Sequence, residues 1–312
     1  MRTRLRVRRH EWVSDSVVSV ELCDADGLPL PPWSPGSHID LTLPGGIVRH
    51  YSLCGDPTQP AWRVAVLREP ESRGGSAYLC ESLREGDVVE AGAPRNNFPL
   101  VPADGYCFVA GGIGITPLIP MMAEVSQQGR PRRLHYGGRR RASMAFLDEV
   151  AAYGAAATVY PEDEVGLLPV VDVVHALPSG WAVYCCGPEP LLRAVESACS
   201  SRPDLTLRLE RFVPVAAEAS ADAPETYTVV LDRSALNVEV GKEDSILEAL
   251  EAAGAPVSQE CREGICGACE TKVLEGDPDH RDSILTAAEK ASCSTMFICV
   301  SGSKSKRLVL DL

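Results

Sequence analysis

The chain has 312 residues, 45% hydrophobic and 23% charged, a balance that predicts two or three globular domains with substantial cores. Its formal net charge of −13 argues against binding to nucleic acid or to an anionic membrane surface. The basic amino terminus lacks the apolar run of a secretory signal, and no stretch approaches the ~20 apolar residues of a membrane-spanning helix, so we expect a cytoplasmic monomer with reduced cysteines.

Residues 1–103 predict a small antiparallel β-barrel. Short runs rich in β-branched residues, such as SVVSVELC and WRVAVLRE, alternate with turns marked by glycine and proline. After one of these strands, the segment RGGSAYL places Gly74, Gly75 and Ser76 ahead of an expected helix. Their backbone N–H groups, the serine hydroxyl and the helix dipole suit the binding of a phosphate.

Residues 104–213 predict an α/β domain with a parallel sheet, because apolar strands alternate with helical patterns. The first strand runs into the glycine-rich turn of VAGGIGITPLIPMM, where the backbone could approach a diphosphate at a helix amino terminus. We expect Thr116 to cap this helix and Pro117 to occupy its first position. The glycines of the turn are Gly111, Gly112 and Gly114.

Residues 214–225 are rich in alanine and lack apolar periodicity, which predicts a linker. Residues 226–312 follow as a further unit with two strands, a helix, a cysteine-rich loop and closing strands. The loop, CREGICGAC, contains Gly264 and Gly267, which permit unusual φ values and allow backbone N–H groups to point at sulfur atoms.

The cysteines of this loop, Cys261, Cys266 and Cys269, have the C-x4-C-x2-C spacing of a plant-type ferredoxin cluster, which needs a distant fourth cysteine. Cys299, on a predicted apolar strand, supplies it, and Cys293 is the rival. Zinc sites usually bring two pairs of ligands, each on its own knuckle. A zinc site and a reduced loop without metal are the alternatives, and we predict a 2Fe–2S cluster.

The same segment resembles the C-terminal ferredoxin domain of the phthalate dioxygenase reductase family, which includes the vanillate demethylase reductases. The resemblance includes DHRDSILT, CVSGS and the closing LVLDL, and it extends over the whole chain. It implies an antiparallel β-barrel domain that binds FMN, with FAD as the alternative flavin, an NAD-binding α/β domain with a parallel sheet, and an α+β ferredoxin domain of the β-grasp type. Their expected bounds are 1–103, 104–213 and, after the linker 214–225, 226–312.

The sequence RHYSL matches the flavin motif R-x-Y-S-L of the ferredoxin–NADP reductase superfamily, which the chain resembles. The resemblance implies that Arg49 pairs with the flavin phosphate and that Tyr51 packs on the ring or the ribityl chain. It places Ser52 near flavin N5, the atom that receives hydride. Leu53 completes the motif, and Arg73 begins the phosphate loop. An edge strand with a packed tyrosine is the structural alternative.

A late Cys-Gly-Pro turn lies beside the nicotinamide in that superfamily, and Cys186, Gly187 and Pro188 match it in YCCGPEPLL. Ser52 and Cys186 are therefore the candidate catalytic residues. Phe212, in LERF, is expected either to cover the flavin near the domain junction or to pack in a core.

The turn HYGGRRRA should border the adenosine ribose of the bound nucleotide. The resemblance implies NADH, with Arg139 beside the nucleotide. Arg139, Arg140 and Arg141 could instead bind a 2′-phosphate bidentately, which would suit NADPH. A solvated basic turn without a ligand is the third possibility.

Together these motifs predict an enzyme, an NADH-dependent reductase in which FMN and a 2Fe–2S cluster carry electrons to a separate terminal oxygenase, of the Rieske type that acts on aromatic compounds. FMN can accept two electrons from NADH and pass them one at a time to the cluster. A plant-type cluster has the low reduction potential that an oxygenase partner needs. A reductase for a haem-thiolate monooxygenase is one alternative. A non-enzymatic cluster-binding redox sensor is the alternative of another class.

Overall fold

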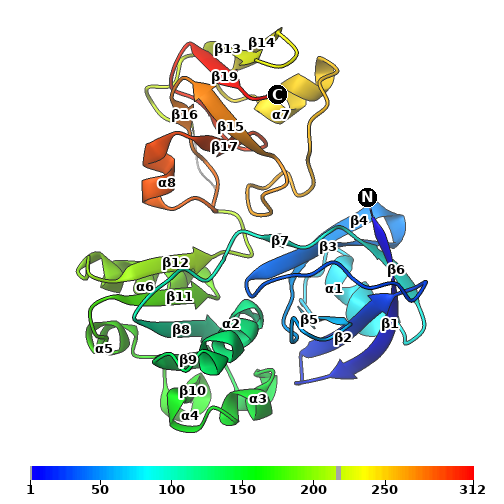
Figure 1. Cartoon of the computed structure of the whole chain (residues 1–312), viewed down its shortest axis with the longest axis vertical. Helices are drawn as coiled ribbons and strands as arrows, with labels where there is room; N and C mark the ends of the chain where they lie inside the picture. The colour runs from blue at the N-terminus through cyan, green and yellow to red at the C-terminus, as the bar shows by residue number, and fades with distance from the viewer. Residues whose placement is uncertain (1, 216–218) are drawn as a thin grey trace. The chain divides into compact units, whose positions relative to one another are not determined.

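The structure is a computed structural model that describes residues 2–215 and 219–312 and divides into two compact units, Met1–Glu210 and Arg211–Leu312 (Figure 1). The first unit contains both an antiparallel barrel and a parallel sheet. The second contains the cysteine-rich loop. Part of the predicted linker, residues 216–218, lies outside the described residues.

The barrel is built from one antiparallel sheet with the strand order β4-β3-β6-β1-β2-β5, in which β7 also pairs with β3. A bridge between Leu53 and Val64 connects the end of β4 with β5, so the sheet is nearly closed. Apolar side chains that alternate along the strands, such as Leu5 and Val7, fill its core. The elements are β1 (Thr3–Trp12), β2 (Val17–Asp24), β3 (Ser37–Leu43), η1 (Pro44–Gly46), β4 (Ile47–Ser52), β5 (Trp62–Leu67), α1 (Gly75–Ala77), η2 (Tyr78–Ser82), β6 (Val88–Ala91) and β7 (Arg95–Asn96).

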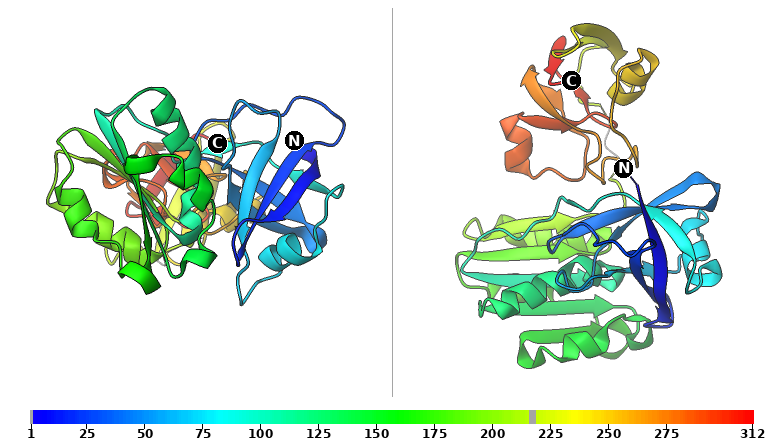
Figure 2. Two further views of the ribbon diagram at one scale, coloured as in Figure 1. Left: turned by 90° about the horizontal axis from the view of Figure 1, so that it is seen from below. Right: turned by 45° about the vertical axis from the view of Figure 1, so that its right-hand side comes forward.

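The parallel sheet of the first unit has the strand order β10-β9-β8-β11-β12, and helices cover both of its faces (Figure 2). Two cores result, one beneath α2 and the other beneath α5 and α6. Its strands are β8 (Gly105–Gly111), β9 (Arg132–Gly138), β10 (Ala157–Pro161), β11 (Trp181–Cys186) and β12 (Thr206–Glu210). Its helices are η3 (Gly112–Gly114), α2 (Ile115–Gln127), η4 (Arg141–Ser143), α3 (Leu147–Ala151), η5 (Gly154–Ala156), α4 (Glu162–Val165), α5 (Val170–His175) and α6 (Glu189–Ser200).

The second unit has a mixed sheet with the order β14-β13-β19-β15-β17, in which β13 and β19 run parallel, and the short β16 pairs with β18. Helix α7 packs on this sheet through Ile246, Leu247 and Leu250, which gives the β-grasp arrangement that the sequence predicted. The elements are β13 (Thr226–Leu231), β14 (Leu236–Gly241), α7 (Ile246–Ala252), β15 (Glu270–Glu275), β16 (Pro278–Asp279), α8 (Ala287–Ser292), β17 (Thr295–Phe297), β18 (Gly302–Ser303) and β19 (Arg307–Leu310).

Two local expectations are wrong. Helix α2 begins at Ile115 with Gly114 as its N-cap, because the turn η3 starts the helical path earlier. Thr116 is its second residue and donates to the Ile113 carbonyl (2.9 Å), and Pro117 is its third, where a missing N–H also costs no intrahelical bond. Cys299 does not lie on a strand: β17 ends at Phe297, and the chain then turns.

Candidate functional sites

The loop after β5 and the end of β4 meet around the side chain of Arg49. Arg49 Nη2 donates to the Arg73 carbonyl (3.0 Å), and its Nη1 donates to the carbonyl of the preceding Val48 (2.8 Å). A Cβ atom at Gly75 would lie 2.7 Å from Arg49 Cγ, and Gly74 has a φ of 90°. Only glycines allow this packing. The Arg49 guanidinium and the start of α1 at Gly75 therefore lie close together, an arrangement suited to binding a phosphate group.

The other residues of the two flavin motifs have different surroundings. Tyr51 is half-buried, and burial raises its pKa against the opposing charge of Arg49, so its phenol stays protonated. Ser52 is 6% exposed at the end of β4. Leu53 is fully buried in the barrel core, so only its backbone can face a ligand. Ser76 Oγ donates to Ser72 Oγ (2.9 Å) and thus ties α1 to the loop that precedes it.

The glycine-rich turn after β8 lies directly against the Cys-Gly-Pro turn after β11, because the two strands are neighbours. A Cβ atom at Gly114 would overlap the Cys186 carbonyl, and one at Gly111 would lie 2.6 Å from Pro188 Cδ. A Cβ at Gly187 would in turn lie 2.9 Å from Gly111 Cα. These three glycines are therefore needed for the two motifs to pack together at the carboxyl edge of the sheet.

Gly112 differs from its neighbours in the same turn. Its φ is 53°, and a Cβ atom there would meet nothing within 4 Å. Of the three glycines in this turn that the sequence assigned to a diphosphate, Gly112 is the one whose backbone faces open space. The start of α2 and this turn fit a nucleotide diphosphate.

The sequence analysis missed Glu210, which pairs with Cys186 across β12 and β11 at the same edge. Burial raises the pKa of Glu210 to about 8, and a hydrogen bond with the Cys186 thiol opposes this shift. Burial and the nearby Glu210 charge also raise the pKa of Cys186, which is fully buried. Glu210 Oε2 is buried with no hydrogen-bond partner among the described residues, so an acceptor remains for a polar group bound there. The only hint in the sequence was that the strand-like segment LTLRLE ends in one acidic residue, Glu210.

The arginine turn after β9 is only partly available for a phosphate. Arg141 binds Glu164 of α4 through two nitrogens, with Nη2 at 2.7 Å and Nε at 3.0 Å. Hydrogen bonding between them raises the pKa of Arg141 and lowers that of Glu164. Arg139 and Arg140 are exposed, and the Arg139 carbonyl accepts from the Asp163 amide (3.3 Å). Acidic residues therefore border the edge at which the adenosine was expected.

Phe212 lies in the second compact unit and is 40% exposed. The flavin motifs belong to the first unit, so the predicted contact of Phe212 with the flavin would lie between two units and stays a prediction. Within the second unit, the described ends of the predicted linker contact the ferredoxin fold. The Val215 amide donates to Ser283 Oγ (3.2 Å), and the Ser220 amide donates to Asp279 Oδ2 (3.0 Å).

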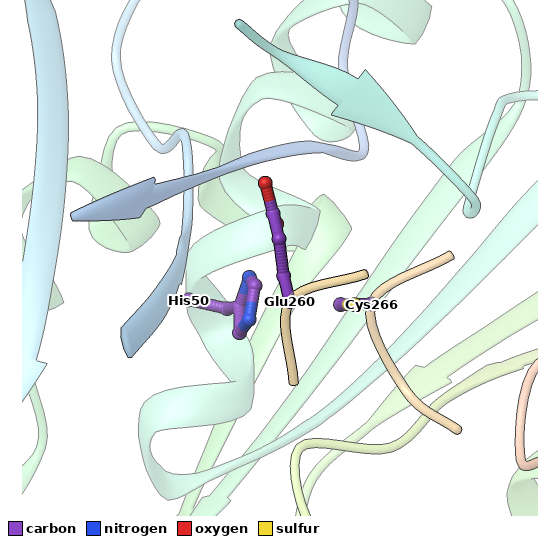
Figure 3. Close-up of side chains that lie close together, drawn as sticks. All are labelled: His50, Glu260 and Cys266. Carbon is purple, nitrogen blue, oxygen red and sulfur yellow. The ribbon is translucent and has the colours of Figure 1, made fainter. Parts of the chain in front are cut away.

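The cysteine loop of the second unit supplies three thiols, of which Cys266 is labelled in Figure 3, and Cys299 supplies the fourth. Cys261 shares a hydrogen bond with Cys266, and Cys269 shares one with Cys299. These bonds lower the pKa values of Cys261 and Cys269 and raise those of their partners. Two pairs of thiols fit two irons with two terminal thiolates each.

Backbone N–H groups surround these sulfur atoms, as the sequence analysis expected. The Glu263 amide donates to Cys261 Sγ (3.3 Å), and the Gly264 amide lowers the pKa of Cys299 by hydrogen bonding. Gly264 has a φ of 68°, and a Cβ there would lie 2.7 Å from Val300 Cγ2. Such donors stabilise sulfur atoms that carry negative charge.

Cys293, the rival for the fourth ligand, lies apart from the thiol pairs. It is the C-cap of α8, and its Sγ donates to Asp277 Oδ1 (3.6 Å) and to the Lys290 carbonyl (3.5 Å). It lines a pocket of about 420 Å³ with His280, Lys290 and Lys304. The geometry therefore favours Cys299.

Comparisons with known proteins agree with this geometry. Residues 229–302 match the family described as the 2Fe-2S iron-sulfur cluster binding domain. The chain is 42% identical to phenoxybenzoate dioxygenase subunit beta of Ectopseudomonas oleovorans over 99% of this chain and 97% of that protein. It is 36% identical to phthalate dioxygenase reductase of Burkholderia cepacia over 99% and 97%. The chain belongs to the phthalate dioxygenase reductase family.

Solved structures extend the comparison. The solved structure of phthalate dioxygenase reductase, described as a modular structure for electron transfer from pyridine nucleotides to 2Fe–2S, matches with a TM-score of 0.70 and 35% identity. The match covers 100% of this chain and 98% of that one. An intact type IV self-sufficient cytochrome P450 monooxygenase matches with a TM-score of 0.93 and 42% identity. The match includes 100% of this chain but only 41% of the P450 chain.

As a member of the phthalate dioxygenase reductase family, the chain is an oxidoreductase, a reductase of oxygenase systems that uses FMN, NADH and a 2Fe–2S cluster. This excludes the non-enzymatic redox sensor. Within the described residues, none of the helices has the length and apolar character to span a membrane.

Proposed function

We propose that Cys261, Cys266, Cys269 and Cys299 hold the 2Fe–2S cluster and that a separate terminal oxygenase receives its electrons. The observation that carries this proposal is the arrangement of the four thiols in two hydrogen-bonded pairs within a cage of backbone N–H groups. A bound flavin would supply the coupling between a two-electron hydride donor, NADH, and the one-electron cluster. The protein residues bind and orient these groups.

We propose that the residues around Arg49 bind the flavin phosphate. Its guanidinium is held by the carbonyls of Arg73 and Val48, and the backbone at Gly74 and Gly75 is open because neither residue has a side chain. Tyr51, protonated and half-buried, offers an apolar face and one hydroxyl beside this group. Ser52 ends the same strand and is the candidate for the contact with the reacting edge of the flavin.

The nucleotide lies, in this proposal, at the carboxyl edge of β8 and β11. Gly112 and the start of α2 bind its diphosphate, and Cys186 is positioned beside the nicotinamide by its bond to Glu210. Because the pKa of Glu210 is about 8, this carboxyl is largely protonated at neutral pH and adds little negative charge near the transferred hydride. A neutral thiol and a neutral carboxyl exclude water and fix the ring without reacting themselves.

Cofactor analysis tests the proposal directly. The purified protein should contain about one FMN, two irons and two labile sulfides per chain, the contents of one flavin site and one plant-type cluster. Zinc without labile sulfide would contradict the cluster assignment. NADH should reduce ferricyanide through the flavin and cytochrome c through the cluster.

The oxygenase partner is the second part of the proposal. Relatives include the reductase subunits of carnitine and toluene-4-sulfonate monooxygenase systems, which favours a separate oxygenase component as the partner, and the family resemblance implies the Rieske type. The close match to part of a self-sufficient P450 favours a haem-thiolate partner as the second candidate. Isolated Rieske and P450 acceptors, each assayed for NADH-driven reduction by this protein, distinguish the two.

A further inference from the structure

One ion pair connects the barrel with the parallel sheet inside the first compact unit. Arg63, on β5, donates from Nη1 and Nη2 to the two carboxylate oxygens of Glu149 on α3, at 2.7 and 2.9 Å. Nη2 also donates to the Cys54 carbonyl (2.6 Å), and the guanidinium lies 4.9 Å from the centre of the Phe146 ring. We call these four groups the Arg63 clamp.

The local sequence fixes both sides of the Arg63 clamp. Cys54 follows the RHYSL motif directly, and its amide donates back to the Arg63 carbonyl (2.8 Å). On the other side, Phe146 is the N-cap of α3 with a φ of 60°, an uncommon value for a residue other than glycine. It is 6% exposed within the core that α2 covers. Glu149 then projects from the first turn of α3.

The rest of the contact between the two folds is mainly apolar and offers little direction. Val17, Cys54 and Ala65 of the barrel belong to the same core as Ile115 and Met121 of the nucleotide-binding half. Directional bonds also cross it: the Asp15 amide donates to the Ala142 carbonyl (2.9 Å), and the Tyr184 hydroxyl accepts from the Val101 amide (2.7 Å) and donates to the Pro99 carbonyl (2.9 Å). A bidentate Arg–carboxylate pair is more restrictive than apolar packing, because both hydrogen bonds fix its plane.

Strand β5 lies between the two candidate binding motifs. Val64 pairs with Leu53 at the end of the flavin motif, and β5 contacts the turn η3 of the nucleotide motif. Hydride transfer needs the reacting atoms about 3–3.5 Å apart, and a displacement of about 1 Å can cost about a hundredfold in rate. Here one fold holds the donor and the other holds the acceptor, so their mutual position sets that distance.

We propose that Arg63 is a positioning residue for hydride transfer, which fixes the flavin-binding barrel against the nucleotide-binding sheet through Glu149, Phe146 and the Cys54 carbonyl. This inference rests on the proposed function of the two motifs. Arg63 touches neither reactant in this scheme. Its removal therefore changes the rate of the chemical step more than the binding of either partner.

Anaerobic stopped-flow measurements on the full chain test this role in Arg63→Met. The account predicts a fall of about tenfold to a hundredfold in the rate constant for flavin reduction by NADH. FMN content and the dissociation constant of NADH should change less than about twofold, since the binding motifs are intact. Exchange of the Asp15 amide hydrogen should accelerate, because its bond to the Ala142 carbonyl, which joins the two folds, then opens more often.

Matched variants separate positioning from stability. Glu149→Gln should lower the same rate constant by less, and the double variant should be no slower than Arg63→Met, because the residues act as one unit. Arg9→Met removes an ion pair of 2.8 Å with Glu11 within the barrel alone and should leave the rate unchanged. If Arg63→Met does not fold or does not retain FMN, Arg63→Lys, which keeps the charge but loses the bidentate fork, takes its place.

The outcomes are distinct. If the unmodified protein fails to reduce its flavin with NADH, the proposed function fails. If it succeeds and FMN-loaded Arg63→Met or Arg63→Lys reduces flavin within twofold of it, the positioning role is overturned. The role is also overturned if the rate falls only in proportion to lost FMN or weakened NADH binding.

Discussion

The cluster loop and the nucleotide edge of this protein are assembled in opposite ways. Three of the four thiols lie within nine residues, and the same loop supplies the backbone N–H groups that surround them. The nucleotide edge joins a turn near Gly112 with a turn near Gly187, and a carboxyl group arrives from β12. Spacing along the chain therefore reveals the first kind of site, whereas sheet topology creates the second.

The largest effect should come from the one cluster residue that is distant in sequence. Cys299→Ser should reduce cluster iron and cytochrome c reduction by roughly tenfold or more, because one thiolate of a pair is lost. Ferricyanide reduction at the flavin should persist. Cys293→Ser is the matched control, since its thiol contacts Asp277 and Lys290 instead. Loss of iron in Cys293→Ser, with iron retained in Cys299→Ser, would reverse the assignment.

Two glycines of one turn test how the nucleotide edge is assembled. Gly114→Ala should lower the unfolding free energy by about 1–3 kcal/mol, because the new methyl group overlaps the Cys186 carbonyl. Gly112→Ala meets open space and should cost only about 1–2 kcal/mol of backbone strain while raising the KM for NADH. Denaturant titrations and steady-state kinetics separate the two. If Gly112→Ala leaves the KM for NADH unchanged and is as stable as the unmodified protein, the diphosphate binds elsewhere.

This contrast explains how much the sequence could predict. The barrel and the parallel sheet follow from the patterns of strands and helices, the β-grasp fold follows from the family resemblance, and the thiol spacing indicates the cluster. The position of Thr116 was mispredicted because the turn η3, with Gly112 and Gly114, starts the helical path before any side-chain cap. Glu210 was invisible as a site residue because its partner, Cys186, lies 24 positions earlier and meets it only across paired strands.

The raised pKa of Glu210 gives a pH dependence that distinguishes the two regions. The folded protein holds this carboxyl protonated up to about pH 8, whereas the unfolded chain ionises near the ordinary value of 4.5. Ionisation on unfolding therefore favours the unfolded state increasingly as pH rises from 4.5 to 8, and the effect is constant above that. Chemical denaturation between pH 6 and 9 should show this decline in stability of the first unit. Glu210→Gln should flatten the decline, and an unchanged slope would refute the buried, protonated state.

The smallest expected effect concerns nucleotide choice. Glu164→Gln should raise kcat/KM for NADPH by up to about tenfold, the equivalent of one charge-assisted hydrogen bond, because the Arg141 fork becomes free for a 2′-phosphate. The NADH value should barely change. Binding of 2′-AMP, measured by calorimetry, should strengthen in parallel. Adding Arg141→Ala to Glu164→Gln should remove the gain in kcat/KM for NADPH. If the gain remains, Arg141 is not the group that binds the 2′-phosphate.

The most direct test of the central claim is a single reductive titration with NADH. NADH is added anaerobically to the purified protein, and the flavin absorbance and the low-temperature EPR spectrum are recorded on the same samples. The account predicts that the flavin bleaches and that the signal of a reduced plant-type 2Fe–2S cluster appears in unmodified protein but not in Cys299→Ser. A bleached flavin without any cluster signal in iron-loaded unmodified protein would contradict electron transfer from the nucleotide edge to the site of the four cysteines.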